Sequence, residues 1–193
     1  MKMNFMKQTI KELKEKFISD SELFIKEIDK LYSLTDEQLN WKPAYDVWSI
    51  AECVEHLSVT NKLYFNEMEK QFYEEQIICD DSEEIVKHKF FGKMIIKAVD
   101  PANVKKTKTF SVFKPEKSSF DNSVIDKLIN IQKDLINLIS ISLNIDFNKY
   151  VMSSPASKFI KENFSDVLEI IRLHNQRHLL QINRIVSDKN FPN

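Results

Sequence analysis

The chain has 193 residues, 42% of them hydrophobic and 30% charged, a balance typical of a folded domain rather than a disordered segment. Its single glycine, Gly92, excludes the glycine-rich phosphate loops of the common nucleotide-binding folds, because those turns need several glycines. With 28 basic and 29 acidic residues and a net charge of -1, the chain has no overall field to attract nucleic acid, so we expect no nucleic-acid partner.

The first predicted helix runs from about residue 4 to residue 34. Its apolar residues recur every three or four positions, which is the spacing of a helix that buries one face. The polar run 19–21 could interrupt this helix. Thr35 and Gln38 then have the spacing of a capping box, which predicts a short helix that ends before Pro43.

The second long helix has the clearest start, because Ser49 can cap it while Glu52 reaches back to the backbone of Ser49. We expect this helix to run from residue 50 to about residue 73. A further helix is predicted over residues 82–99, and the alternation of apolar and polar residues over 107–114 indicates an extended segment.

The third and fourth long helices are predicted to begin after Ser123 and Ser165, and the fourth to end near Ser187. About fifty residues separate the second and third long helices. The pattern therefore predicts an all-α fold, a four-helix bundle with a long crossover between the second and third long helices. Since the sequence contains no repeat and no linker, we expect a single domain over residues 1–193.

The two cysteines, Cys53 and Cys79, lie far apart in the chain and outside any CxxC spacing, which favours a reducing compartment over a disulfide scaffold. Charges interrupt the first 18 residues, which is not typical of an export signal, and no apolar run approaches the roughly 18 residues of a membrane span. We expect a cytoplasmic protein that does not bind membranes.

Two of the four histidines, His174 and His178, lie four positions apart in the last predicted helix and therefore on one of its faces. Gln181 shares this face, which is otherwise apolar, so the three side chains should point toward the core. Two imidazoles at this spacing can chelate one metal ion. The spacing alone is equally compatible with two hydrogen-bonded core histidines.

His56 favours the metal-binding interpretation, because it lies on the apolar face of the second long helix, one turn after Cys53. Three inward-facing histidines are most economically explained by one shared ion. Neutral imidazoles on facing helices suit Zn, Ni, Fe, Co or Mn, and three of them leave coordination positions open. His88 lies in the charged stretch 83–89 and is interpreted as an ordinary surface histidine.

Other side chains near these histidines have simpler interpretations. The capping role of Glu52 is sufficient to explain it, and Cys53 is predicted to be an inert core thiol. Trp41 and Trp48 are expected to pack at the helix entry rather than stack on a substrate. Arg177 is interpreted as solvated or salt-bridged rather than as an anion clamp.

Three stretches together resemble the DinB-like superfamily and, within it, the DinB-2 group, which includes the bacillithiol transferases. They are residues 39–43, residues 48–57 and the run from His174 to Arg184, HNQRHLLQINR; residues 154–155 and 158–160 extend the similarity. The combination of a tryptophan-to-histidine motif with a late HxxxHxxQ motif is specific, and the resemblance covers nearly the whole chain.

The resemblance implies a four-helix bundle in which a divalent metal is held by three histidines, here His56, His174 and His178. It also implies thiol transferases or isomerases that use a low-molecular-weight thiol, with some hydrolysis, and a homodimer. The sequence departs from the family pattern in two ways: the glycine often found before the last helix is absent, and residues 144–163 form an irregular loop.

The leading hypothesis is a metal-dependent thiol S-transferase or hydrolase that activates a low-molecular-weight thiol, or water, for attack on a small electrophilic substrate. Gln181 would stand behind the ligands and orient an imidazole or bound water, or else be a satisfied core amide. No catalytic residue is assigned. Two alternatives remain: a non-catalytic metal-binding module with a stress or regulatory role, and a structural dimerisation domain.

Overall fold

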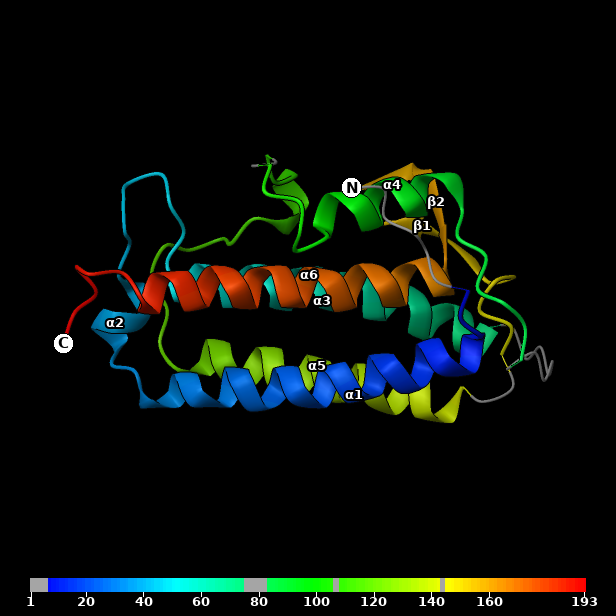
Figure 1. Ribbon diagram of the computed structural model, residues 1–193, viewed down its shortest axis with the longest axis horizontal. Helices are drawn as coiled ribbons and strands as arrows, with labels where there is room; N and C mark the ends of the chain where they lie inside the picture. The colour runs from blue at the N-terminus through cyan, green and yellow to red at the C-terminus, as the bar shows by residue number, and fades with distance from the viewer. Residues whose placement is uncertain (1–6, 75–82, 106–107, 143–144) are drawn as a thin grey trace.

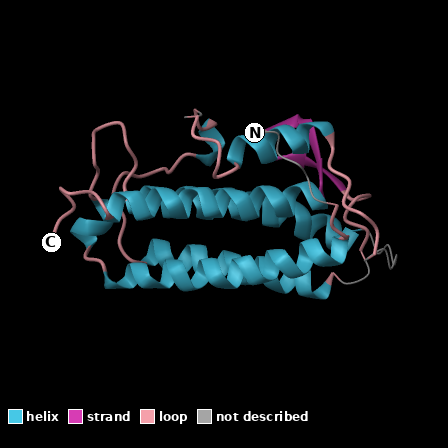
Figure 2. Cartoon of the chain, viewed as in Figure 1, coloured by secondary structure: helices cyan, strands magenta, loops and turns pink. Residues whose placement is uncertain are grey.

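The computed structural model of the chain describes residues 7–74, 83–105, 108–142 and 145–193. Four long helices lie side by side along the long axis of the molecule, and a small helix and a hairpin lie against one end of them (Figure 1). Helix dominates the described residues, and the loops gather at the ends and along one side (Figure 2). The structure is therefore mostly helical, in agreement with the predicted class.

The elements follow the predicted order, with one hairpin that was not predicted. In chain order they are α1 (Ile10–Asp29), the 3-10 turn η1 (Lys30–Ser33), α2 (Asp36–Asn40), α3 (Ile50–Glu74), α4 (Phe90–Val99), the 3-10 turn η2 (Ser111–Phe113), α5 (Ser123–Ile141), β1 (Val151–Ser154), β2 (Ser157–Asn163) and α6 (Phe164–Val186).

The predicted capping boxes begin their helices as expected. At the start of α3 the backbone amide of Ser49 donates to Glu52 Oε2 at 2.8 Å, and the amide of Glu52 donates to Ser49 Oγ at 3.1 Å. Thr35 begins α2 with the same reciprocal pair of bonds. Because these bonds satisfy amides that the helix itself leaves free, they fix where α3 starts and hence where His56 lies along it.

The apolar side chains form two clusters along the helices. One surrounds Phe17 and Phe164 near the hairpin, and the other surrounds Leu57 and Ile125 toward the opposite end. Helix α1 packs on α5 and α6, and α3 packs on the same two helices. Every long helix therefore contributes to both clusters, and polar side chains occupy the boundary between them.

Three sequence-based predictions about local structure are wrong. Residues 19–21 do not interrupt α1, and Ser21 is buried against its neighbours instead. The helix predicted over 82–99 begins only at Phe90, because Ile85 forms an isolated β-bridge with Thr9. The segment predicted as extended contains the 3-10 turn Ser111–Phe113. Residues 4–6, 82 and 107 and Cys79, which also entered those predictions, lie outside the described residues.

The irregular loop predicted over 144–163 contains the antiparallel hairpin β1–β2. Val151 pairs with Asn163, and an irregularity in the register lies between Ser153 and Ser154. Asn163 ends the hairpin and caps α6 through a capping box with Asp166. Among the described residues, no helix is long and apolar enough to cross a membrane.

Candidate metal centre

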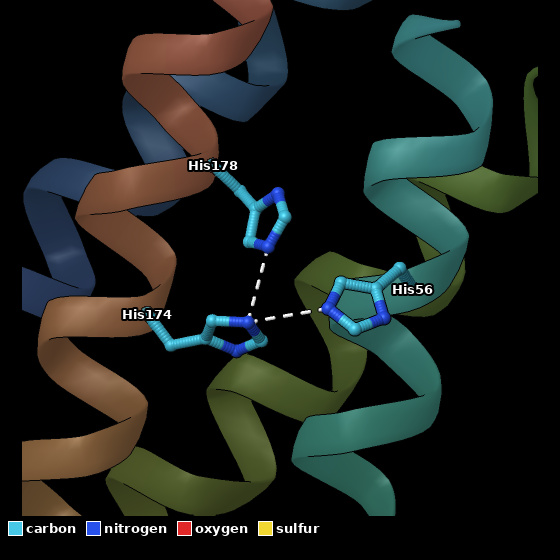
Figure 3. Close-up of side chains that lie close together, drawn as sticks. All are labelled: His56, His174 and His178. Atoms are coloured by element: carbon cyan, nitrogen blue, oxygen red, sulfur yellow. Dashed lines mark hydrogen bonds between the residues drawn. The ribbon is translucent and has the colours of Figure 1, made fainter. Parts of the chain in front are cut away.

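Three histidine side chains meet between α3 and α6 (Figure 3). Nε2 of His174 lies 3.2 Å from Nε2 of His56 and 3.0 Å from Nε2 of His178. One nitrogen from each ring lies within 4.8 Å of the others. The one-turn spacing on α6 places His174 and His178 on the same face, and the packing of α3 on α6 brings His56 to them.

The ring of His56 is oriented by a backbone carbonyl. Its Nδ1 lies 2.6 Å from the carbonyl oxygen of Phe113, in η2. Because a carbonyl oxygen can only accept, Nδ1 must carry the hydrogen, which leaves Nε2 with a free lone pair. This lone pair points toward His174 and the centre of the cluster (Figure 3). The sequence reasoning missed Phe113, since it contributes a backbone group that any residue would supply.

All three histidines are held in the neutral form. Burial lowers the pKa of His56, although the bond to Phe113 acts in the opposite direction. Burial lowers the pKa of His178 to about 3, helped by His56 and the positive charge of Arg177. The pKa of His174 falls well below its ordinary value through burial and the other two rings. Neutral imidazole is the form that binds metal ions.

The arrangement of the nitrogens suits a cation better than a set of hydrogen bonds. With the hydrogen of His56 on Nδ1, its Nε2 can only accept, so a bond to His174 requires a hydrogen on Nε2 of His174. That nitrogen then has no lone pair left for His178. One shared cation would satisfy all three nitrogens at once, so the donor set fits a divalent transition metal.

Comparison with known proteins identifies the family. Residues 26–182 match the family model of the DinB superfamily. The chain belongs to the DinB superfamily. The matched range contains all three histidines and most of the four long helices of this DinB-superfamily chain. No curated protein and no solved structure matches it.

Trp48 covers the histidine cluster in this DinB-superfamily chain. Its ring centroid lies 4.8 Å from that of His56 and 6.1 Å from that of His178, with the second pair only 22° from parallel. Trp41 instead packs edge-on against Phe191, 5.6 Å away. The two tryptophans therefore have different surroundings, a difference that the sequence did not predict.

The outer groups behave differently from the ligand candidates. Gln181 acts on His178 to raise its pKa, yet Nδ1 of His178 is buried and makes no hydrogen bond of regular geometry with any described residue. Arg177, interpreted from sequence as solvated or salt-bridged, donates instead to the backbone carbonyls of Asp100, Asn103 and Lys105. The interpretation of Arg177 was wrong because its partners are main-chain groups.

Three further sequence interpretations can be compared with the structure. Glu52 caps α3 as predicted and also pairs with Lys42 at 2.6 Å. Cys53 is fully buried, and burial raises the pKa of its thiol, as expected of an inert core cysteine. The interpretation of His88 was wrong: its side chain is 5% exposed, and its Nδ1 lies 2.9 Å from Oδ1 of Asp166.

Proposed function

We propose that this DinB-superfamily chain is a divalent-metal-dependent enzyme in which His56, His174 and His178 hold Zn, Ni, Fe, Co or Mn. The observation that carries the proposal is the convergence of three neutral imidazole nitrogens from two facing helices. The packing of the four long helices supports the finer architecture, a four-helix bundle with a long crossover between α3 and α5, in a single domain over residues 1–193.

A divalent metal bound by three imidazoles lowers the pKa of a thiol or a water molecule and so supplies a nucleophile at neutral pH. The residues of the chain prepare the site for this chemistry. The carbonyl of Phe113 holds a hydrogen on Nδ1 of His56, which keeps Nε2 available as a ligand. Burial keeps His174 and His178 unprotonated, and Trp48 shields two of the rings.

The proposed reaction is the attack of a low-molecular-weight thiol on a small electrophilic substrate, or of water in a hydrolase. Within the part of the chain that the structure describes, no carboxylate or thiol joins the three histidines in their cluster. This favours a site with open coordination positions over the closed site of a non-catalytic module. Gln181, beside His178, is proposed to orient a ligand ring, and the protein is proposed to be a homodimer.

Metal analysis tests the first half of the proposal. Untagged protein purified without a nickel column should carry about one equivalent of a transition metal. Less than about a tenth of an equivalent, together with no uptake from added Zn²⁺, Fe²⁺, Co²⁺, Ni²⁺ or Mn²⁺, would overturn the metal centre and leave a structural domain.

A thiol screen tests the second half. The metal-loaded protein is mixed with bacillithiol, glutathione, mycothiol or coenzyme A and a generic electrophile such as monochlorobimane, and loss of free thiol is followed. Consumption of one thiol that stops on chelation supports a transferase. A stable metal with no thiol consumption and no hydrolysis of model esters or amides would favour the non-catalytic module.

A further inference from the structure

The long crossover between α4 and α5 is fastened by side chains at three places. Arg177 Nη1 donates to the carbonyl of Asp100 at 3.1 Å and to that of Asn103, and Nη2 donates to the carbonyl of Lys105 at 3.0 Å. His56 then donates to the carbonyl of Phe113. The described parts of the crossover, 100–105 and 108–122, contain no regular element other than η2.

The third fastening lies beyond Phe113. The side-chain amide of Asn40, at the end of α2, donates to the carbonyl of Phe120 at 2.7 Å, and its oxygen accepts from the amide of Phe120 at 2.9 Å. Asn40 thus pairs with one residue of the crossover as a neighbouring strand would. The crossover is therefore anchored before Phe113 by Arg177 and after Phe113 by Asn40.

These anchors matter because apolar packing does not hold η2 in place. None of the three residues of η2 is buried, and Phe110 and Val112 are 60% and 43% exposed. The carbonyl of Phe113 nevertheless has to stay in position, since it is the bond that orients His56. Polar bonds at the two ends of the segment supply the restraint that packing does not.

We infer that Arg177 and Asn40 are positioning residues of the metal centre, which anchor the crossover on both sides of Phe113 and so fix the ligand His56. The inference rests on the proposed function, because it assigns a role toward the same metal. It extends that proposal to residues that touch neither metal nor substrate. By linkage, a metal bound at the histidines should in turn stabilise the crossover.

The charge of Arg177 makes the inference easy to test. Its guanidinium is close enough to lower the pKa of both His174 and His178, so it also repels a cation at the site. If charge were its only influence, replacing Arg177 with methionine would tighten metal binding. If it positions the crossover, the same substitution should weaken binding by about tenfold, a typical effect of groups that orient metal ligands.

The experiment compares Arg177→Met and Asn40→Leu with Arg184→Met and Asn183→Leu, whose side chains are exposed on α6. Zn²⁺ affinity is measured in competition with a chromogenic chelator, and Co²⁺-loaded protein is examined by visible absorption. We expect about tenfold weaker Zn²⁺ binding and an altered Co²⁺ spectrum for both anchor variants, and values within about twofold of the parent for both controls. Arg177→Lys, which keeps the charge but not the forked donors, should lie between.

Trypsin provides a readout on the crossover itself, through the exposed Lys105 and Lys108. Bound Zn²⁺ should slow cleavage at these lysines in the parent protein and in the controls, and should do so much less in Arg177→Met. Equal or tighter Zn²⁺ binding by Arg177→Met, or a lower melting temperature with unchanged affinity, would overturn the inference. Should Arg177→Met fail to fold, Arg177→Lys and Asn40→Leu decide in the same way.

The two proposals can fail separately. If the parent protein binds no metal, the proposed function fails, and the positioning role fails with it. If the parent protein binds metal and both anchor variants bind it as tightly as the controls do, the metal centre stands and only the positioning role is wrong.

Discussion

Two groups of buried polar side chains lie close together along the long helices, and they satisfy their hydrogen bonds in different ways. In the amide group, one residue comes from each of α1, α3, α5 and α6: Ser21, Asn61, Gln132 and Asn175. Gln132 donates to Ser21 at 2.7 Å and accepts from Asn175 at 3.0 Å, and Asn61 donates to Asn175 at 3.1 Å. Because each amide carries both donors and an acceptor, the group is closed within the protein.

The histidine group lies at the same boundary between the two apolar clusters, since His174 directly precedes Asn175 on α6. Its three Nε2 atoms face one another, and the hydrogen of His56 is committed to Phe113. A neutral imidazole has one donor and one acceptor, so the group cannot close on itself as the amides do. Burial alone therefore does not mark a functional site; a surplus of acceptors that face one another does.

The largest effect should follow from removal of one ligand. His56→Ala should reduce metal affinity at least about 100-fold, because two imidazoles remain where three converged, while far-ultraviolet circular dichroism stays unchanged. His88→Ala keeps the number of histidines equal and serves as the matched control, since His88 pairs with Asp166 and not with the cluster. Equal metal content in the two variants would contradict the site.

A third buried polar group, Glu162 in β2, should make stability depend on pH. Its side chain is fully buried, its Oε2 has no hydrogen-bond partner among the described residues, and Tyr64 and Ser154 face it. Burial raises its pKa to about 7, and the charge of Asp166 acts in the same direction. Unlike the histidines, this group holds its own proton.

The sign follows from that shift. The folded protein binds the proton of Glu162 more tightly than the unfolded chain does, so the free energy of unfolding should fall as pH rises from about 4.5 to about 7, by on the order of 3 kcal/mol. Glu162→Gln should remove this part of the pH dependence. Urea denaturation of both proteins at pH 5 and pH 8 measures the difference, and parallel profiles would show that Glu162 does not titrate as predicted.

The amide group should contribute to stability and not to metal binding. Gln132→Leu leaves Asn61, Asn175 and Ser21 without their shared partner in a buried site, so the free energy of unfolding should fall by about 2 kcal/mol. Metal affinity should stay within about twofold of the parent value, in contrast to His56→Ala. Loss of metal at unchanged stability, measured by urea denaturation and chelator competition, would show that the two groups act as one.

The sequence predicted the features that depend on side-chain spacing. Capping boxes located the starts of α2 and α3, and the four-residue spacing placed His174 and His178 on one face. That His56 meets them depends on how α3 packs on α6, which the apolar face of α3 only suggested. The resemblance to the DinB superfamily added the third ligand candidate as a family expectation, and the family match agrees with that assignment to the superfamily.

The features that were missed depend on backbone groups or on distant contacts. The carbonyls bound by His56 and Arg177 leave no trace in the sequence, because every residue has one. His88 lies among charged residues, which suggested the surface. Gly92 has no Cβ, and this allows the carboxylate of Asp166 to approach α4 closely enough to pair with His88.

The smallest effect should follow from Trp48→Leu. The indole contacts the faces of His56 and His178 and none of the nitrogens, so its loss should weaken packing around the rings without removing a ligand. We expect about threefold weaker metal binding, corresponding to well under the effect of His56→Ala, with Trp41→Leu as the control because Trp41 packs on Phe191 instead. A loss as large as that of His56→Ala would mean that the shape of the site, and not the surplus of acceptors, governs metal binding.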